Sequence, residues 1–253
     1  MEFTSVREAL SRIAAVHVGV DIGQKVDHTA IVVAEVGERP TADGSTYADW
    51  RTGRQVPVME STYRVHELRR LALGTPFVTV TAEIVQMVAA IHEMERAMRR
   101  EGRLTPYEHT LDVDLWMDAT GLGAPIFELV RDALLASTAT DRCMVHPVVF
   151  NYGDRFKRGE YEGHGDVLGK AFLVNRLQIL LEQNRLDLPK SDPQIADMVE
   201  ELKQYEIRID TDANEKYGAF IVGAHDDLVT ALGLAALEDP GYYAMHAGPV
   251  IFP

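Results

Sequence analysis

The chain has 253 residues, of which 46% are hydrophobic, enough for one large domain with a buried core. A formal net charge of −14 argues against bulk electrostatic binding of nucleic acid, which needs Lys and Arg, but leaves room for a nuclease whose acidic site is neutralised by metal. The single cysteine, Cys143, excludes an internal disulfide, and no window approaches a transmembrane span or a signal peptide, so we expect a cytosolic protein without a membrane partner.

The N-terminal part of the chain predicts one helix and three strands. Residues 1–15 have the pattern of a short amphipathic helix. Residues 16–23, VHVGVDIG, form a β-branched run that ends in glycine and predict a buried strand, and residues 28–37 predict its antiparallel hairpin partner. Residues 37–60 are polar and predict a loop or a small extra hairpin, whereas residues 61–71 predict a third strand.

Helices and strands alternate in the middle of the chain. The apolar spacing over residues 81–102 predicts a helix, and residues 112–118 predict a strand that ends at an aspartate. Residues 123–137 predict a helix with a proline in its first turn, and residues 143–150 predict another strand. Residues 151–166 are rich in glycine and mixed charge, which predicts a loop.

The C-terminal part predicts two helices over residues 167–189 and 192–205, a short strand at 217–224 and a last helix over 225–239. The succession of elements predicts an α/β fold with an antiparallel hairpin at its start. One domain is expected, because the sequence has no internal repeat or composition break. It would consist of the N-terminal helix over 1–15, a core over 16–238 and a tail over 239–253.

Aspartates stand at three places where predicted elements end or begin. Asp21 follows the apolar run of the first strand, Asp118 ends the fourth strand, and the pair Asp226 and Asp227 opens the last helix. Sites in α/β sheets form outside the ends of neighbouring strands. If the first and fourth strands are adjacent, Asp21 and Asp118 emerge side by side, and the last helix can present Asp226 or Asp227 to the same place.

Such a cluster predicts a metal site. Carboxylates without Lys or Arg in the same motifs repel one another, and a carboxylate in an apolar strand is costly unless a cation meets it. Oxygen ligands suit Mg²⁺ or Mn²⁺, and no Cys or His spacing competes for zinc. We therefore predict two divalent cations, Mg²⁺ or Mn²⁺, about 3.5–4 Å apart, the arrangement that cleaves phosphodiesters.

Each aspartate also has a plain structural interpretation. Asp21 can be a turn residue, Asp118 can cap the following turn, and Asp226 can be a helix N-cap, with Asp227 placed favourably against the helix dipole. The joint occurrence of all four, in an order that lets them converge, favours the metal site.

Three segments resemble the acidic motifs of a known family: GVDIGQKVDHTAIVV, LWMDATGLGAPIFELV and HDDLVTALGLAAL. With GKAFLVNRLQILLEQNRLDLP and the later VEELKQYE, they are similar to the nuclease domain of tailed-bacteriophage large terminases, over residues 16–238. The resemblance implies an RNase H-like, resolvase-like fold, with a central mixed sheet and helices on both faces.

The resemblance also implies an endonuclease that cuts concatemeric double-stranded viral DNA when packaging starts and ends. By motif, Asp21, Asp118 and Asp227 would be catalytic metal ligands, with Asp226 a further ligand or a neighbour of the ligands. In the family this domain follows an ATPase motor, but the sequence has no G-x-x-x-x-G-K-[ST] motif, so this chain is not the motor. The expected partners are a packaging motor, a small terminase and a portal, in the cytoplasm of an infected bacterium.

Five further residues are secondary candidates. His225 can ligate a metal or orient an aspartate, although a helix-start residue with a backbone hydrogen bond is the stronger interpretation. Lys170 can contact the scissile phosphate, and a solvated lysine is an equally good interpretation. The predicted loop carries Arg155, Lys157 and Arg158, interleaved with aromatic residues, which predicts contact with DNA.

Three other functions stay open. An actin- or sugar-kinase-like ATPase shares the RNase H core, and DIGQ and DATGLG can be read as phosphate loops, but such proteins need two domains and a longer chain. A Holliday-junction resolvase uses a similar acidic set. A degenerate nuclease fold that only docks portal or motor proteins is disfavoured by the complete set of acids.

Overall fold

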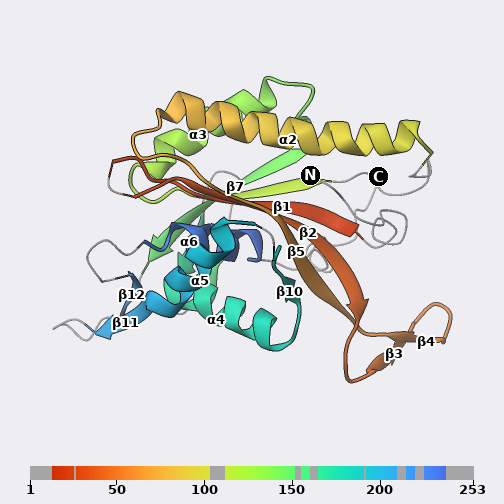
Figure 1. The fold of residues 1–253 in the computed structure, drawn as a ribbon. Helices are drawn as coiled ribbons and strands as arrows, with labels where there is room; N and C mark the ends of the chain where they lie inside the picture. Colours follow the sequence, from red (N-terminus) through yellow and green to blue (C-terminus); the bar gives the residue numbers. More distant parts are fainter. Residues whose placement is uncertain are drawn as a thin grey trace.

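The computed structural model shows a mixed sheet with helices on both of its faces (Figure 1). It describes residues 13–25, 27–102, 112–151, 155–159, 165–190, 192–209, 215–219 and 225–237. Within these residues the central sheet has eight strands, in the order β10-β5-β2-β1-β6-β7-β9-β8. The strands are β1 (Ile13–Asp21), β2 (Ala30–Pro40), β5 (Met59–Arg70), β6 (Val113–Asp118), β7 (Cys143–Asn151), β8 (Phe156–Lys157), β9 (Asp166–Gly169) and β10 (Leu186–Asp187).

The strand directions are those of the predicted RNase H-like fold. β2 pairs antiparallel with β1 and with β5, whereas β1, β6, β7 and β9 run parallel to one another. The central strands therefore follow the order β5-β2-β1-β6-β7, with β2 alone reversed among these five. This confirms the mixed sheet and the hairpin at its start, and it brings the carboxyl ends of β1 and β6 to one edge.

Helices cover the two faces of the sheet in separate groups (Figure 1). One face carries α2 (Phe77–Arg100) and α3 (Gly123–Leu135). The other face carries α4 (Lys170–Glu182), α5 (Gln194–Gln204) and α6 (Asp227–Ala235).

Two hydrophobic cores, one on each face, explain the unbroken apolar run of β2. Ile31 and Val33 belong to the core that includes α2 and α3, whereas Val32 and Ala34 belong to the core that includes α4 and α6. Successive side chains of a strand point to opposite faces, so a strand that is covered on both faces needs apolar residues at every position.

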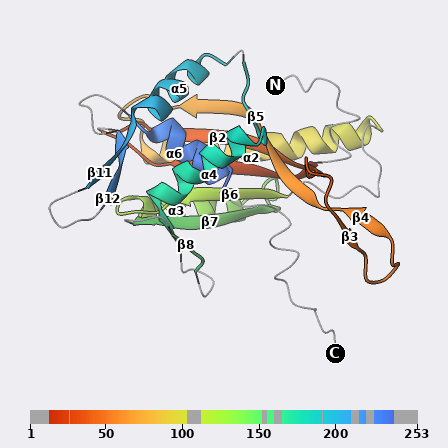
Figure 2. The same ribbon diagram turned by 90° about the horizontal axis from the view of Figure 1, so that it is seen from below.

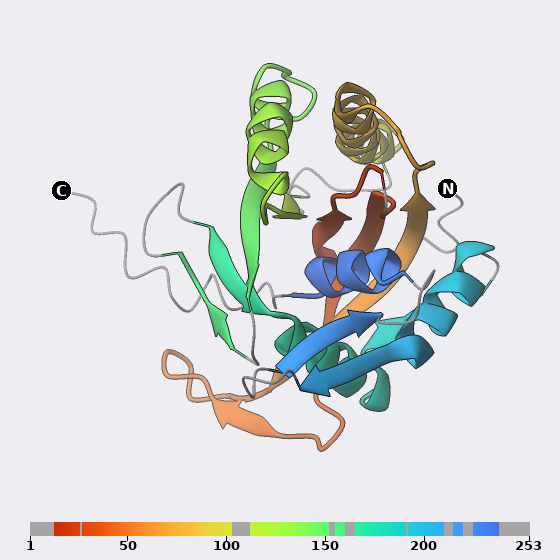
Figure 3. The ribbon, with the colours of Figure 1, turned by 90° about the vertical axis from the view of Figure 1, so that its left-hand side faces the viewer.

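The buried helix α6 lies across the sheet against β1 (Figure 3). A Cβ atom on Gly19 would lie 2.0 Å from the backbone oxygen of Ala231, so only glycine lets the helix approach this closely. His17 Nδ1 lies 3.1 Å from the carbonyl oxygen of Ala235, and burial lowers the pKa of this imidazole to about 4. These contacts fix the position of α6 relative to β1.

Two short hairpins project from opposite ends of the molecule (Figures 1 and 2). The hairpin of β3 (Thr46–Ala48) and β4 (Gln55–Pro57) is the small extra hairpin expected within residues 37–60. The other pairs β11 (Tyr205–Ile209) with β12 (Glu215–Ala219). β11 was not predicted. The strand predicted at 217–224 begins at Glu215 in the structure, and residues 220–224 lie outside the described residues.

Other differences from the predicted elements lie at their ends. Residues 13–15 belong to β1 rather than to a helix, while residues 1–12 and the tail over 239–253 lie outside the described part. The helix predicted over 167–189 begins only at Lys170, because the residues before it form β9 on the sheet. The predicted loop before it contains the short strand β8.

Helix α2 corrects one expectation. Among the described residues it is the one helix long and apolar enough, by length and composition alone, to cross a membrane, so the prediction that no window approaches this length was wrong. Ile84, Val88 and Ile91 of α2 are buried in the core that α2 and α3 form with the sheet. Core helices pass the same test of length and composition.

Candidate metal centre

One edge of the sheet carries Asp118, Asp21 and Arg70 in a row. β1 and β6 pair in parallel, so Asp21 and Asp118 end adjacent strands, as the sequence analysis required. On the other side of β1, Asp21 is paired with Ala30 of β2, and Ala30 is paired with Arg70 at the end of β5. The row therefore begins with two carboxylates and ends with a guanidinium.

The two carboxylates of this row resist ionisation. Burial raises the pKa of Asp21 well above its usual range, and the neighbouring carboxylates of Asp118, Asp226 and Asp227 raise it further. The Lys170 ammonium acts in the opposite direction. Burial also raises the pKa of Asp118, although its Oδ1 accepts a 2.7 Å hydrogen bond from the Thr120 amide. The site is thus short of positive charge.

Lys170 supplies a cation that the acidic motifs lack. It is the first residue of α4, directly after β9, and its Nζ lies 3.0 Å from Asp226 Oδ2. Burial lowers the pKa of this ammonium, but the charges of Asp226, Asp21 and Asp118 outweigh burial and raise it. Lys170 is therefore part of the acidic cluster rather than a solvated residue.

The two aspartates at the start of α6 have different partners. Asp226 stands at the N-cap position, but its side chain makes no capping hydrogen bond and contacts Lys170 instead. Asp226 is therefore the N-cap residue by position, as one interpretation expected, but its carboxylate does not cap the helix. Asp227 is 1% exposed, and its Oδ2 lies 3.0 Å from Arg70 Nε. Burial raises the pKa of Asp227, and the Arg70 guanidinium opposes this shift.

Glu201 of α5 caps α6 in place of Asp226. Its Oε2 accepts hydrogen bonds from the amides of Leu228 and Val229, at 3.0 and 3.2 Å, and its Oε1 pairs with Arg70 Nη2. Neither Arg70 nor Glu201 was predicted as a site residue from the sequence. Each is a charged residue inside an ordinary strand or helix pattern, and no local signal distinguishes it from a solvated residue.

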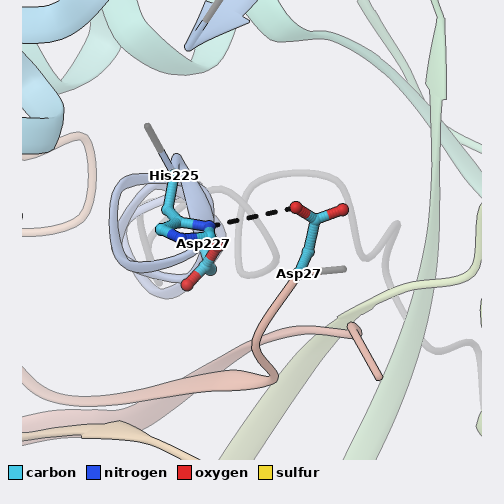
Figure 4. A group of neighbouring side chains, drawn as sticks. All are labelled: Asp27, His225 and Asp227. Atoms are coloured by element: carbon cyan, nitrogen blue, oxygen red, sulfur yellow. Dashed lines mark ion pairs between the residues drawn. The ribbon is translucent and has the colours of Figure 1, made fainter. Parts of the chain in front are cut away.

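A second group of possible ligands lies at the same helix start. Figure 4 shows Asp27, His225 and Asp227 near one another, and the ligand atoms of these residues lie within 4.8 Å of one another. His225 Nδ1 is 3.8 Å from Asp227 Oδ1 and 4.0 Å from Asp27 Oδ1. Arg70 already balances the charge of Asp227. This group therefore offers a cation less uncompensated negative charge than the acidic cluster of Asp21, Asp118 and Asp226 does.

The structure places the predicted DNA-contact residues along β8. The carbonyl oxygen of Arg155 accepts a 2.8 Å hydrogen bond from the amide of Gly169, the residue before Lys170. Lys157 is paired with Val167, farther back along β9, and Arg158 follows it. Of these three basic residues, Arg155 therefore lies nearest to the acidic cluster.

The cluster has the chemistry of a site for hard divalent cations. Asp21, Asp118 and Asp226 offer carboxylate oxygens from β1, β6 and α6, the ligand type that Mg²⁺ and Mn²⁺ prefer. When all three are ionised, they carry three negative charges, against the one positive charge of the Lys170 ammonium that each of them stabilises. A divalent cation balances the remaining negative charge.

The solved structures that resemble this chain are nuclease domains of large terminases. The nuclease of thermophilic phage G20c with bound cobalt is 16% identical, with a TM-score of 0.45, and the match covers 88% of this chain and 81% of the other. The manganese-soaked, inhibitor-bound domain of human cytomegalovirus is 12% identical, with a TM-score of 0.45 and coverages of 96% and 95%. The manganese-bound domain of bacteriophage SPP1 is 10% identical, with a TM-score of 0.37 and coverages of 89% and 87%. No protein-family model and no curated protein sequence matches the chain.

Proposed function

We propose that this chain is a metal-dependent DNA endonuclease of the large-terminase type. It hydrolyses phosphodiester bonds of double-stranded DNA with little sequence preference, and its task is to cut concatemeric viral DNA during genome packaging. The observation that carries the proposal is that Asp21 and Asp118 end adjacent parallel strands, and that Asp226, at the start of α6, adds to the effect of burial in raising the pKa of both carboxyls.

In this proposal Asp21, Asp118 and Asp226 hold two Mg²⁺ or Mn²⁺ ions. Such ions stabilise the charge that develops on phosphate and make bound water a nucleophile at neutral pH. The raised pKa of Asp21 supports the assignment, because a carboxyl kept from ionising by burial and by its neighbours gains most from a cation. We place Asp21 between the other two ligands, since its strand β1 lies between β6, which ends in Asp118, and β2, and α6 packs against β1.

The chain's own cations bind and orient the substrate. The Lys170 ammonium lies within the acidic cluster and can move from Asp226 to a phosphate oxygen, a change from one charged partner to another. Arg155, beside β9, contacts the DNA backbone next to the cleaved bond, and Lys157 and Arg158 contact it farther from this bond.

This sequence has no G-x-x-x-x-G-K-[ST] ATPase motif, so we infer that a packaging motor, a small terminase and a portal are the partners of this nuclease.

Plasmid nicking tests the proposal. Supercoiled plasmid is incubated with the protein in Mn²⁺, Mg²⁺, Ca²⁺ or EDTA, and the nicked and linear products are quantified on a gel. We expect cleavage in Mn²⁺ and Mg²⁺ and none in EDTA. Asp21→Asn and Asp118→Asn should lower the cleavage rate by at least about 1,000-fold, because each removes a ligand of ions that carry several kcal/mol of transition-state stabilisation.

The matched control is Asp112→Asn, an exposed position at the opposite end of β6, which should cleave like wild type. Cleavage retained in both ligand variants would refute the assignment.

Cleavage of a four-way junction and binding of ATP test the alternative functions. Preference for the junction over linear duplex would favour a resolvase, and ATP binding without cleavage would favour an actin- or sugar-kinase-like protein.

A further inference from the structure

The geometry points to separate roles for the adjacent aspartates at the start of α6. We propose that Asp226 serves the cation cluster, whereas Asp227 is a positioning residue, held with Arg70 and Glu201 in a buried ion network that fixes where α6 begins. The inference rests on the proposed function, and it differs from the family pattern, in which Asp227 would be the ligand.

The register of the sheet sets up this division. Asp21 and Arg70 stand at the carboxyl ends of β1 and β5, on either side of Ala30 at the start of β2. The residues at the start of α6 reach both ends of this row, since Asp226 contacts Lys170, which lies beside the acidic cluster, and Asp227 contacts Arg70. The two consecutive aspartates at the start of α6 are therefore paired with different cations, Asp226 with Lys170 of α4 and Asp227 with Arg70 of β5.

The ion network joins three elements. The Arg70 guanidinium contacts Asp227 Oδ2 through Nε, at 3.0 Å, and Glu201 Oε1 through Nη2. The side chains of Arg70, Glu201 and Asp227 are only 16%, 6% and 1% exposed. Glu201 Oε2 also accepts the amide hydrogens of Leu228 and Val229, so the network ties the backbone of α6 to β5 and α5.

The same contacts make Asp227 a poor ligand for a cation. A divalent ion on its carboxylate would lie beside the guanidinium that already balances it, or would displace this guanidinium and leave Arg70 buried with one partner fewer. Removing one partner from a buried ion pair is strongly destabilising. Asp226 has no such conflict, because its partner Lys170 is 30% exposed and has a flexible stem.

Fixing the N-terminus of α6 in turn fixes Asp226. The described residues of α6 are buried, so the helix cannot adapt its position independently of the sheet and α5. A shift at Leu228 or Val229 would therefore carry Asp226 away from Asp21 and Asp118. Groups that orient metal ligands typically change metal affinity by about 10- to 100-fold when they are mutated.

Substitutions of Asp226 and Asp227 test their separate roles directly. The melting temperature is measured in EDTA, and the Mn²⁺ affinity is measured by electron paramagnetic resonance. Asp226→Asn should weaken Mn²⁺ binding by at least about 100-fold, with the melting temperature close to that of wild type. Asp227→Asn should lower the melting temperature by at least about 6 °C, because it breaks a buried ion pair, and should weaken Mn²⁺ binding by about 10-fold or less. The inference is overturned if Asp227→Asn abolishes Mn²⁺ binding while its melting temperature is unchanged.

Glu201 tests the positioning role without altering any carboxylate at the start of α6. Glu201→Ala should weaken Mn²⁺ binding by about 10-fold at a temperature well below its melting point. Glu201→Gln keeps an oxygen for the two helix amides and should restore most of this affinity. Unchanged affinity in Glu201→Ala would show a purely structural network and would contradict the inference.

Different results would overturn the proposed function and the separate roles of Asp226 and Asp227. Wild-type protein that binds no Mn²⁺ and cuts no DNA overturns the proposed function. Wild-type protein that binds Mn²⁺, combined with equal losses of affinity in Asp226→Asn and Asp227→Asn and no loss of melting temperature, overturns only the division of roles.

Discussion

Asp21 is a carboxylate at the end of an apolar strand. The groups around it determine the free-energy cost of ionising its carboxyl. It is buried among like charges, with Lys170 as the nearby cation that opposes them. Burial and repulsion raise its pKa, so ionising this carboxyl costs more in the fold than in the unfolded chain. The charge of this one residue therefore links the stability of the fold to pH and to cation binding.

This linkage gives a prediction for Asp21→Asn in EDTA. Because the pKa of Asp21 is raised in the fold, protonation contributes stability that is fully present below the unfolded pKa, about 3.9, and is lost as pH rises through the folded pKa. Asparagine cannot ionise, so the variant should melt at a higher temperature than wild type at pH 7. The difference should shrink toward pH 4, in melting curves measured by circular dichroism.

Asp112→Asn is again the control, because Asp112 is exposed and remote from the cluster. An Asp21→Asn variant that is less stable than wild type at pH 7 in EDTA would show that Asp21 is well compensated without metal. Such a result would contradict the electrostatic description of the site.

At the scale of elements, the close approach of α6 to β1 positions the candidate centre. Gly19 lies against the backbone of α6, where an added Cβ would be 2.0 Å from Ala231 O and 2.5 Å from Ala235 N. Neither atom can turn aside as a side chain would, because both belong to the helix backbone. Any larger residue at this position must push the helix off the strand.

We therefore predict that Gly19→Ala is strongly destabilising. Overpacking costs typically about 1–3 kcal/mol, and the backbone clash here should place the cost at or above the upper end, a fall in melting temperature of at least about 6 °C. Urea denaturation measures the free energy of unfolding. Gly44→Ala is the control: its Cβ meets open space at a φ of +68°, so strain alone should cost about 1–2 kcal/mol. Equal effects of the two substitutions would refute the close approach.

At the scale of the whole molecule, the sheet and five described helices hold acidic groups together that would repel one another without cations. A cation that binds only the folded state stabilises that state by mass action. Metal binding should therefore appear as a change in global stability, in addition to any change in activity.

Mn²⁺ at about 100 times its Kd should add about 2.7 kcal/mol to the free energy of unfolding. For a chain of this size that corresponds to a rise in melting temperature of about 5–11 °C. Differential scanning calorimetry measures the rise, and excess EDTA should reverse it. Asp118→Asn should show little of the gain, because it removes a ligand. A rise of the same size in this variant would mean that Mn²⁺ binds elsewhere.

Much of the fold and part of the candidate site could be predicted from local patterns. Asp21 and Asp118 stand at the ends of apolar strands, and parallel strands bring their carboxyl ends to one edge of a sheet. Lys170 was recognised as a candidate, but the first turn of a helix gives no indication of which charges lie opposite. Arg70 and Glu201 were missed, because their importance depends on the pairing of β5 with β2 and on the docking of α5 against α6.

The sequence by itself determined the alternation of strands and helices, the initial hairpin and the places where acidic residues end these elements. These features follow from apolar periodicity and turn residues, which act over a few positions along the chain. Only the tertiary structure decided which cation meets which carboxylate: Lys170 with Asp226, and Arg70 with Asp227. The partners in these pairs are 56 and more than 150 residues apart, so strand register and helix docking, rather than any local pattern, determine whether they meet.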